Sequence, residues 1–230
     1  MKKYLILFAL ILIQGCGGGG DDATYVPSSP TDVPTDPTTE FQLFATGTFT
    51  DGYRTTYDLT GTSTVGDVFT GTISSRTLAT STFLGQDAVP ILSQLELTNT
   101  VSGAFTSSIS TGYYSTSATD RHFLGFTDST QETVSAVTSA IPQTAKIGDF
   151  GVIGTYTFNT GDVEEQSWRL DDGRNGLAKF VILSTMKDQF NQVQFNTTST
   201  STIDTSGNSI STQVIYYYPD TGITVTLNTI

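Results

Sequence analysis

Sulfur and imidazole are almost missing from this chain of 230 residues, which has one cysteine, Cys16, and one histidine, His122. A single cysteine cannot form a disulfide within the chain, and neither a thiolate cluster nor a histidine cluster can be assembled around a metal ion. We therefore expect no metal site, no cofactor and a fold that is stabilised by its hydrophobic core alone.

Positive charge is also scarce, with 10 lysines and arginines against 22 aspartates and glutamates. A strongly acidic surface repels phosphate backbones and anionic head groups. We expect no nucleic-acid binding, and any attachment to a membrane must come from something other than basic residues.

Long apolar runs are absent apart from residues 4–13, which follow the basic head formed by Lys2 and Lys3. Ten helical residues cover about 15 Å, roughly half of a hydrocarbon core that is about 30 Å thick. A short apolar run behind a basic head is typical of a signal peptide, and we assign residues 1–15 to one.

The residues that end this run are Ile13, Gln14, Gly15 and the only cysteine, Cys16. They resemble the lipobox of bacterial lipoproteins. The resemblance implies cleavage before Cys16, a diacylglycerol thioether on its sulfur and an acyl chain on its new amino group. Two or three chains hold a protein on a bilayer almost permanently. Gly17, in place of an aspartate, implies delivery to the outer membrane.

The next segment, residues 16–40, contains four prolines, four glycines, several acidic residues and almost no apolar side chain. It cannot bury enough surface to offset its ordering entropy, so we predict a disordered tether that reaches roughly 80 Å when fully extended. Loss of residues 1–15 removes two of the 10 basic residues and leaves a net charge of −14.

Beyond residue 40, apolar and polar residues alternate in many short runs, such as "DVFTGTISS" and "ISTQVIYYY". Asp-Gly and Asn-Gly pairs at 51–52, 172–173 and 175–176 punctuate these runs and indicate turns. Residues 41–230 are therefore predicted to form an all-β domain, an antiparallel β-sandwich or a curved two-layer sheet with little helix. Two similar halves, 41–128 and 147–230, are a further hypothesis.

Two segments are candidate helices, residues 87–96 and 131–141. In the second, Val134, Val137 and Ile141 recur at spacings of three and four, which places them on one helical face. The rest of that segment is mostly threonine and serine, which are indifferent helix formers.

Nucleophile motifs are weak. Ser184 and Lys187 have the Ser-x-x-Lys spacing, but they follow a strand pattern in which positions three apart point to opposite faces. His122, with Asp120 and Asp128 near it in the sequence, is the only basis for a serine-hydrolase triad, and no Gly-x-Ser-x-Gly elbow is present.

Glu164, Glu165, Asp171 and Asp172 flank the single tryptophan, Trp168, a residue type that stacks on sugars, and could in principle serve glycoside hydrolysis. Glu164 and Glu165 are adjacent and point to opposite faces of a strand, so they cannot by themselves form the catalytic pair. For a hydrolase the candidates are Glu165, Trp168 and Asp171. Residues 171–176, "DDGRNG", lack the alternate oxygens and the final glutamate of an EF-hand loop, so we interpret them as a tight turn.

Aromatic clusters are the most suggestive feature for binding. The candidate ligand-binding residues are Trp168, Tyr113, Tyr114, Tyr216 and Tyr218, of which the last two share one face of a strand. Exposed rings of this kind could contact a glycan or an envelope protein.

Three functions remain open. The first is a non-catalytic binding module, the second a structural or assembly lipoprotein of the outer membrane, and the third a hydrolase acting on glycans. We expect the protein not to be an enzyme.

Overall fold

The computed structural model describes residues 33–230, and these residues form antiparallel strands without any helix. The all-β prediction is therefore confirmed. The earlier strands are β1 (Glu40–Gln42), β2 (Arg54–Ser63), β3 (Val68–Thr77), β4 (Ser81–Phe83), β5 (Gln86–Asn99), β6 (Phe105–Ser115), β7 (Asp120–Arg121) and β8 (Phe123–Asp128). The later strands are β9 (Thr133–Thr138), β10 (Ile141–Pro142), β11 (Thr144–Lys146), β12 (Phe150–Phe158), β13 (Val163–Arg174), β14 (Leu177–Lys187), β15 (Val193–Ile203), β16 (Ser209–Tyr218) and β17 (Ile223–Thr229).

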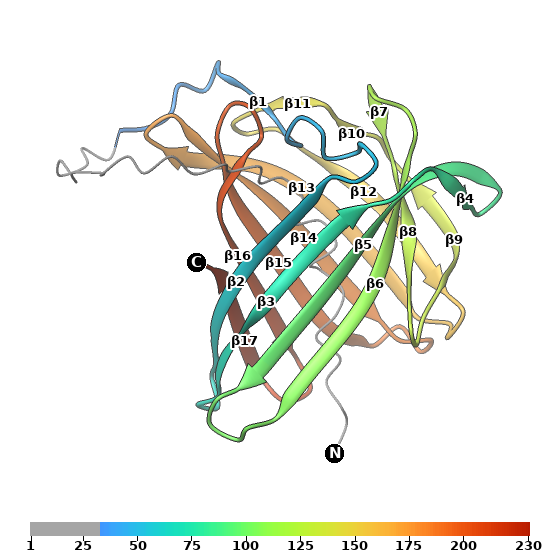
Figure 1. Ribbon diagram of the computed structural model, residues 1–230, viewed down its shortest axis with the longest axis vertical. Helices are drawn as coiled ribbons and strands as arrows, with labels where there is room; N and C mark the ends of the chain where they lie inside the picture. Colours follow the sequence, from blue (N-terminus) through green and yellow to red (C-terminus); the bar gives the residue numbers. More distant parts are fainter. Residues whose placement is uncertain (1–32) are drawn as a thin grey trace.

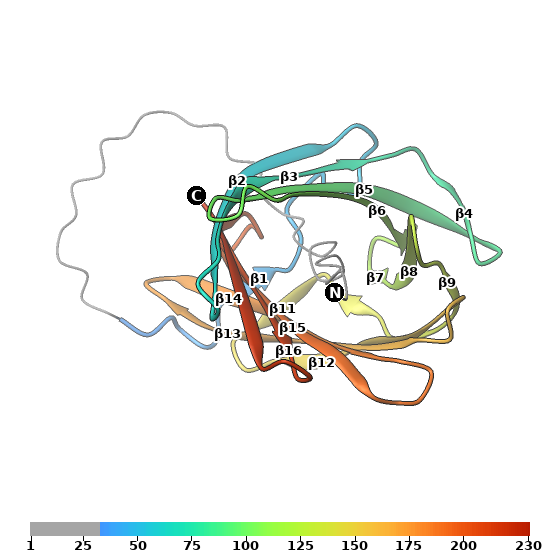
Figure 2. The same cartoon turned by 90° about the horizontal axis from the view of Figure 1, so that it is seen from below.

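One large sheet contains all but four of these strands. Its order is β8-β6-β5-β3-β2-β17-β16-β15-β14-β13-β12-β9, with β4 attached to β5. Figures 1 and 2 show that the sheet bends around the paired strands β2 and β17, so that two walls face each other and the edge strands β8 and β9 nearly close the sheet. This is the curved two-layer arrangement expected from the alternating pattern.

The two ends of the sheet lie side by side at a seam between β8 and β9. No strand ladder joins these two neighbours within the described range; a single bridge pairs Thr127 with Glu132. Side chains complete the seam, because Thr133 Oγ1 accepts a hydrogen bond from the Phe126 amide at 3.0 Å. At the other end of β9, His122 Nδ1 lies 3.0 Å from Thr138 Oγ1.

Alternation explains why these segments are strands. In β13, Glu164, Gln166, Trp168 and Leu170 are buried inside the curl while the residues between them face outward. Gly151 lies opposite Trp168 on β12, and a Cβ at that position would come within 2.7 Å of the indole Nε1. The missing side chain therefore makes room for the indole.

The two helix expectations were wrong. Residues 87–96 belong to β5, which pairs with β3 and β6, and residues 131–141 form β9 and the start of β10. Val134 and Val137 do not pack on a common face; both are exposed on β9. Pairing with β12 along the whole of β9 outweighs the weak helical spacing of a Thr- and Ser-rich segment.

The two ends of the curled sheet differ. One end, which we call the capped end, is covered by the small sheets β1–β11 and β7–β10 (Figure 1). Phe41 and Leu43 of this cap extend into a buried cluster with β8, β12, β13 and β14. The opposite end, the cavity end, carries the six turns that follow β2, β5, β8, β12, β14 and β16, and a second cluster is built there by β2, β3, β5, β16 and β17.

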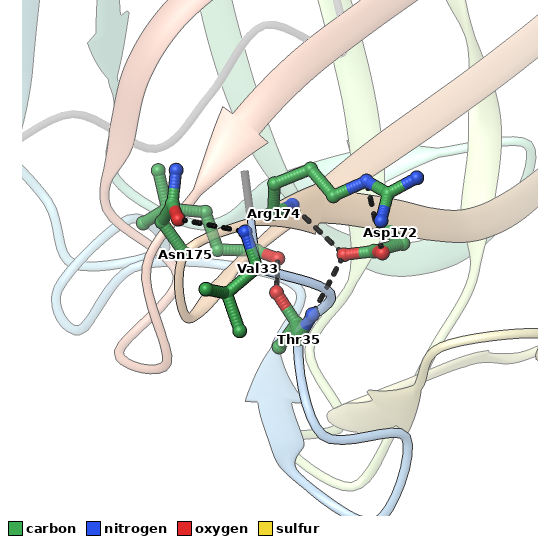
Figure 3. A network of polar contacts seen from close by, with 6 residues as sticks. Val33, Thr35, Asp172, Arg174 and Asn175 are labelled. Atoms are coloured by element: carbon green, nitrogen blue, oxygen red, sulfur yellow. Dashed lines mark hydrogen bonds and ion pairs between the residues drawn. The ribbon is translucent and has the colours of Figure 1, made fainter. Parts of the chain in front are cut away.

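Val33 and Thr35, at the start of the described residues, lie at the capped end against the β13–β14 hairpin (Figure 3). The Asn175 amide donates to the Val33 carbonyl at 2.8 Å, and Asp172 Oδ1 accepts from the amides of Thr35 at 3.1 Å and Arg174 at 2.8 Å. These hydrogen bonds hold the pKa of Asp172 below its usual range. Residues 33–40, predicted as part of the tether, thus lie against the body. The signal peptide and the rest of the tether lie outside the described residues.

Both predicted halves, 41–128 and 147–230, contribute to the same continuous sheet, and their duplication stays a prediction. No helix that could span a bilayer is found within residues 33–230.

Candidate ligand-binding site

A cavity opens at the cavity end between three hairpins. It is lined by the β2–β3, β5–β6 and β16–β17 hairpins, which are adjacent in the sheet because β3 pairs with β5 and β17 pairs with β2. The Thr64 amide donates to the Thr224 carbonyl at 2.9 Å, and the Thr100 amide donates to the Val68 carbonyl at 2.8 Å. The three turns are therefore fixed to one another by main-chain hydrogen bonds.

A small polar network holds the rim of the cavity in shape. The Asp67 carboxylate accepts from Asn99 Nδ2 at 2.8 Å and from Ser63 Oγ at 2.9 Å. Asn99 Oδ1 in turn accepts from the amides of Val101 and Ser102. One oxygen of Asp67 thus accepts a hydrogen bond from its own hairpin and the other from the neighbouring β5–β6 hairpin, so the site is built before any ligand arrives.

The cavity has a volume of about 250 Å³ and is mainly apolar. Its lining residues are Val65, Asp67, Phe69, Leu97, Asn99, Ala104, Thr106, Tyr218, Ile223 and Val225. Concave apolar sites with a few fixed polar groups are typical of ligand-binding pockets. This arrangement offers shape and apolar contact rather than a reactive group.

Two exposed apolar side chains lie on the turns beside the mouth of the cavity. Val65 lines the cavity on the β2–β3 turn and is 62% exposed, and Val101 on the β5–β6 turn is 68% exposed. We call these two residues the apolar rim. Val68 and Phe105 are also exposed, but on the outer face of the sheet, because their neighbours Phe69 and Thr106 line the cavity. Exposed apolar side chains beside a cavity are common at interaction sites.

The cavity end is also acidic. Six carboxylates lie in or next to its turns: Asp67, Asp128, Glu132, Asp162, Asp188 and Asp220. Lys187 is the one basic residue that the described chain places there, and its Nζ lies 2.7 Å from Glu165 Oε1. The other seven basic residues of the described range lie towards the capped end, on β2, β3, β7, β11, β13 and β14.

Four of the five aromatic candidates face the interior. Trp168, Tyr114 and Tyr216 are buried in the core, and Tyr218 is buried with its ring at the wall of the cavity. Tyr113 lies on the outer face, where its ring stacks on Phe83 with centroids 4.0 Å apart. The structure therefore brings only Tyr218 to the cavity, and these five residues do not form one exposed face.

The candidate catalytic residues are kept apart. Glu165 pairs with Lys187, and Asp171 pairs with Arg169 at 2.8 Å, all on the outer face of the sheet. Trp168 points the other way, into the core. Glu165 and Asp171 therefore do not flank the tryptophan.

The nucleophile motifs are also dispersed. Ser184 points into the core and Lys187 outward, as the strand pattern predicts. His122 contacts Thr138, while Asp120 lies in the cap and Asp128 at the cavity end. No group of three His, Cys, Asp or Glu side chains that could hold a metal occurs among residues 33–230.

From the sequence, Glu164 is considered only as a partner of Glu165 in a carboxylate pair, and its burial is not predicted. Glu164 is fully buried in the core, where its Oε1 accepts hydrogen bonds from Gln166 Nε2 and Ser184 Oγ, and burial raises its pKa to about 7. Burial, together with the Glu164 charge, also raises the pKa of Tyr156 well above its ordinary value. The alternating pattern carried the signal, because Glu164 is in phase with Trp168 and Leu170.

Comparison with protein-family models, curated proteins and solved structures found no match to this chain. The function has to be argued from the chemistry of the site.

Proposed function

We propose that this protein is a lipid-anchored protein of the bacterial outer membrane that binds a partner through its cavity end without catalysing a reaction. The observation that carries the proposal is a preformed apolar cavity of about 250 Å³ with exposed Val65 and Val101 on the turns beside its mouth. Burial of apolar surface in such a site favours binding by about 25 cal/mol for each Å² removed from water.

The position of the site supports the same proposal. Val33, the first described residue, lies on the β13–β14 hairpin at the capped end, and the cavity lies at the other end of the sheet. An anchor at Cys16 would therefore join the body from the side opposite the binding site. The cavity mouth would be free to meet a partner that is not in the same lipid leaflet.

Ala104→Trp tests the cavity. The added indole is expected to fill the space and weaken binding of N-phenyl-naphthylamine, an uncharged probe that fluoresces in apolar sites, by about tenfold or more. Ala104 is exposed on a turn, so the fold should tolerate the change. Ser102→Trp, on the same turn but outside the lining, is the matched control and should bind like the wild type. Equal probe binding by wild type and Ala104→Trp would refute the cavity as the site.

Cys16→Ser tests the anchor. Since two or three acyl chains give nearly permanent attachment, the wild-type protein is expected to sediment with envelope membranes and the variant to remain soluble. Mass spectrometry of the wild type should show a chain that begins at a lipid-modified Cys16. An uncleaved precursor with a free thiol would contradict the anchor while leaving the cavity proposal to its own test.

A further inference from the structure

We infer that the partner is a protein with a basic surface that inserts one large apolar side chain into the cavity. This inference rests on the proposed function and adds the chemical class of the partner. Three independent properties of the cavity end support it: the size of the cavity, the apolar rim and the distribution of charge.

The size of the cavity fits one side chain. The cavity has a volume of about 250 Å³. Complete small-molecule ligands occupy pockets of roughly 300 to 1,000 Å³. A single aromatic or large aliphatic side chain matches the smaller space, and buried anchors of that kind dominate the energetics of protein interfaces.

The apolar rim fits the surface around such an anchor. Val65 and Val101 lie on two neighbouring hairpin turns beside the mouth, where a small ligand held inside the cavity would leave them in water. A protein surface seated on the mouth would cover them. Contacts that surround an anchor and exclude water from it are a general feature of protein interfaces.

The charge distribution selects a basic partner. The turns of this end carry six carboxylates, of which Asp67 and Asp220 lie in the hairpins that form the cavity, and one lysine, which already pairs with Glu165. An acidic end of this kind attracts basic surfaces and repels acidic ones, and it speeds association with the former at low ionic strength.

Three fluorescein-labelled pentapeptides test the inference by fluorescence anisotropy. The first has a central tryptophan between two pairs of lysines, the second replaces the lysines by glutamates, and the third replaces the tryptophan by alanine. We expect the first peptide to bind at least about tenfold more tightly than either of the others. Its affinity should fall as the salt concentration rises. Equal binding of the first two, or of the first and third, would overturn the inference.

Two variants locate the binding site. Asp220 lies in the β16–β17 turn next to lining residues Tyr218 and Ile223, while Asp51 is exposed at the capped end. Asp220→Lys is expected to weaken binding of the tryptophan–lysine peptide several-fold. Asp51→Lys makes the same change in net charge and is expected to leave the affinity for this peptide unchanged. Equal effects would show that only the overall charge matters and would contradict a local site.

The uncharged probe separates failure of this inference from failure of the proposed function. Binding of N-phenyl-naphthylamine without selective peptide binding would leave the cavity proposal intact and refute the basic protein partner. If neither the uncharged probe nor the tryptophan–lysine peptide binds, both the proposed function and the basic protein partner are refuted. Tight binding of dodecyltrimethylammonium at the cavity, with no preference for the tryptophan peptide, would assign the site to a cationic amphiphile instead.

Discussion

Replacing Glu164 with glutamine is expected to raise the free energy of unfolding by about 3 kcal/mol above pH 8 and to change it little at pH 4.5. The carboxyl is fully buried, and its pKa rises from an ordinary 4.5 to about 7 in the folded protein. Each unit of pKa difference corresponds to about 1.4 kcal/mol between the folded and unfolded states.

The sign follows from proton binding. Between pH 4.5 and 7 the folded protein holds the Glu164 proton and the unfolded chain releases it, so stability falls as the pH rises through this interval. Above about pH 7 the folded protein contains a buried ionised carboxylate, and the full cost is present. Glutamine can still accept the hydrogen bonds of Gln166 and Ser184 through its amide oxygen, but it carries no charge.

Urea unfolding measured from pH 4.5 to 8.5 checks this prediction, and the single tryptophan, Trp168, reports the transition by fluorescence. Glu165→Gln is the matched control, because Glu165 is the next residue but faces solvent in an ion pair with Lys187. Glu165→Gln should change the free energy of unfolding by at most about 1 kcal/mol. Parallel pH curves for wild type and Glu164→Gln would show that Glu164 does not titrate in this range.

Replacing Trp168 with alanine is expected to lower the free energy of unfolding by about 3 to 5 kcal/mol while leaving probe binding at the cavity unchanged. Trp168 is 5% exposed and packs near Phe180, with ring centroids 6.1 Å apart. It does not line the cavity. The substitution removes a large buried side chain and leaves a void that Gly151, opposite it, cannot fill.

Circular dichroism in urea measures this loss, since the variant has no tryptophan. Tyr217→Ala is the control: Tyr217 is exposed on the outer face of β16, so its effect should be within about 1 kcal/mol. A variant at Trp168 that keeps its stability but loses probe binding would return this residue to the ligand-binding role suggested by its sequence.

Alternation was sufficient to predict the fold class. In β13 every second residue from Glu164 to Leu170 is buried, and in β16 Tyr216 and Tyr218 share the inner face as their spacing predicts. The same rule separated Ser184 from Lys187. These features depend only on the two-residue period of a strand, which a sequence displays directly.

Which face is inside could not be read from the aromatic residues alone. A tyrosine is compatible with a half-exposed surface and with a core, and the curl of the sheet makes the face of Tyr114 and Tyr216 an interior. The cavity could not be predicted from the sequence either, because Ile223 comes next to Phe69 and Leu97 only when β17 pairs with β2. Contacts between residues so far apart depend on the register of the whole sheet.

The pairing of β17 with β2 also sets the order in which the molecule can be completed. The hydrogen bond from the Thr224 amide to Thr64 Oγ1 joins residues 160 positions apart. When the chain is made or exported from its N-terminal side, β2 can pair with β3 early. It lacks its other neighbour, β17, until residues 223–229 follow. Contacts of such long range slow folding, and an unpaired strand edge invites aggregation while it waits. Until residues 223–229 are made, this edge of β2 is therefore the exposed edge of the incomplete sheet.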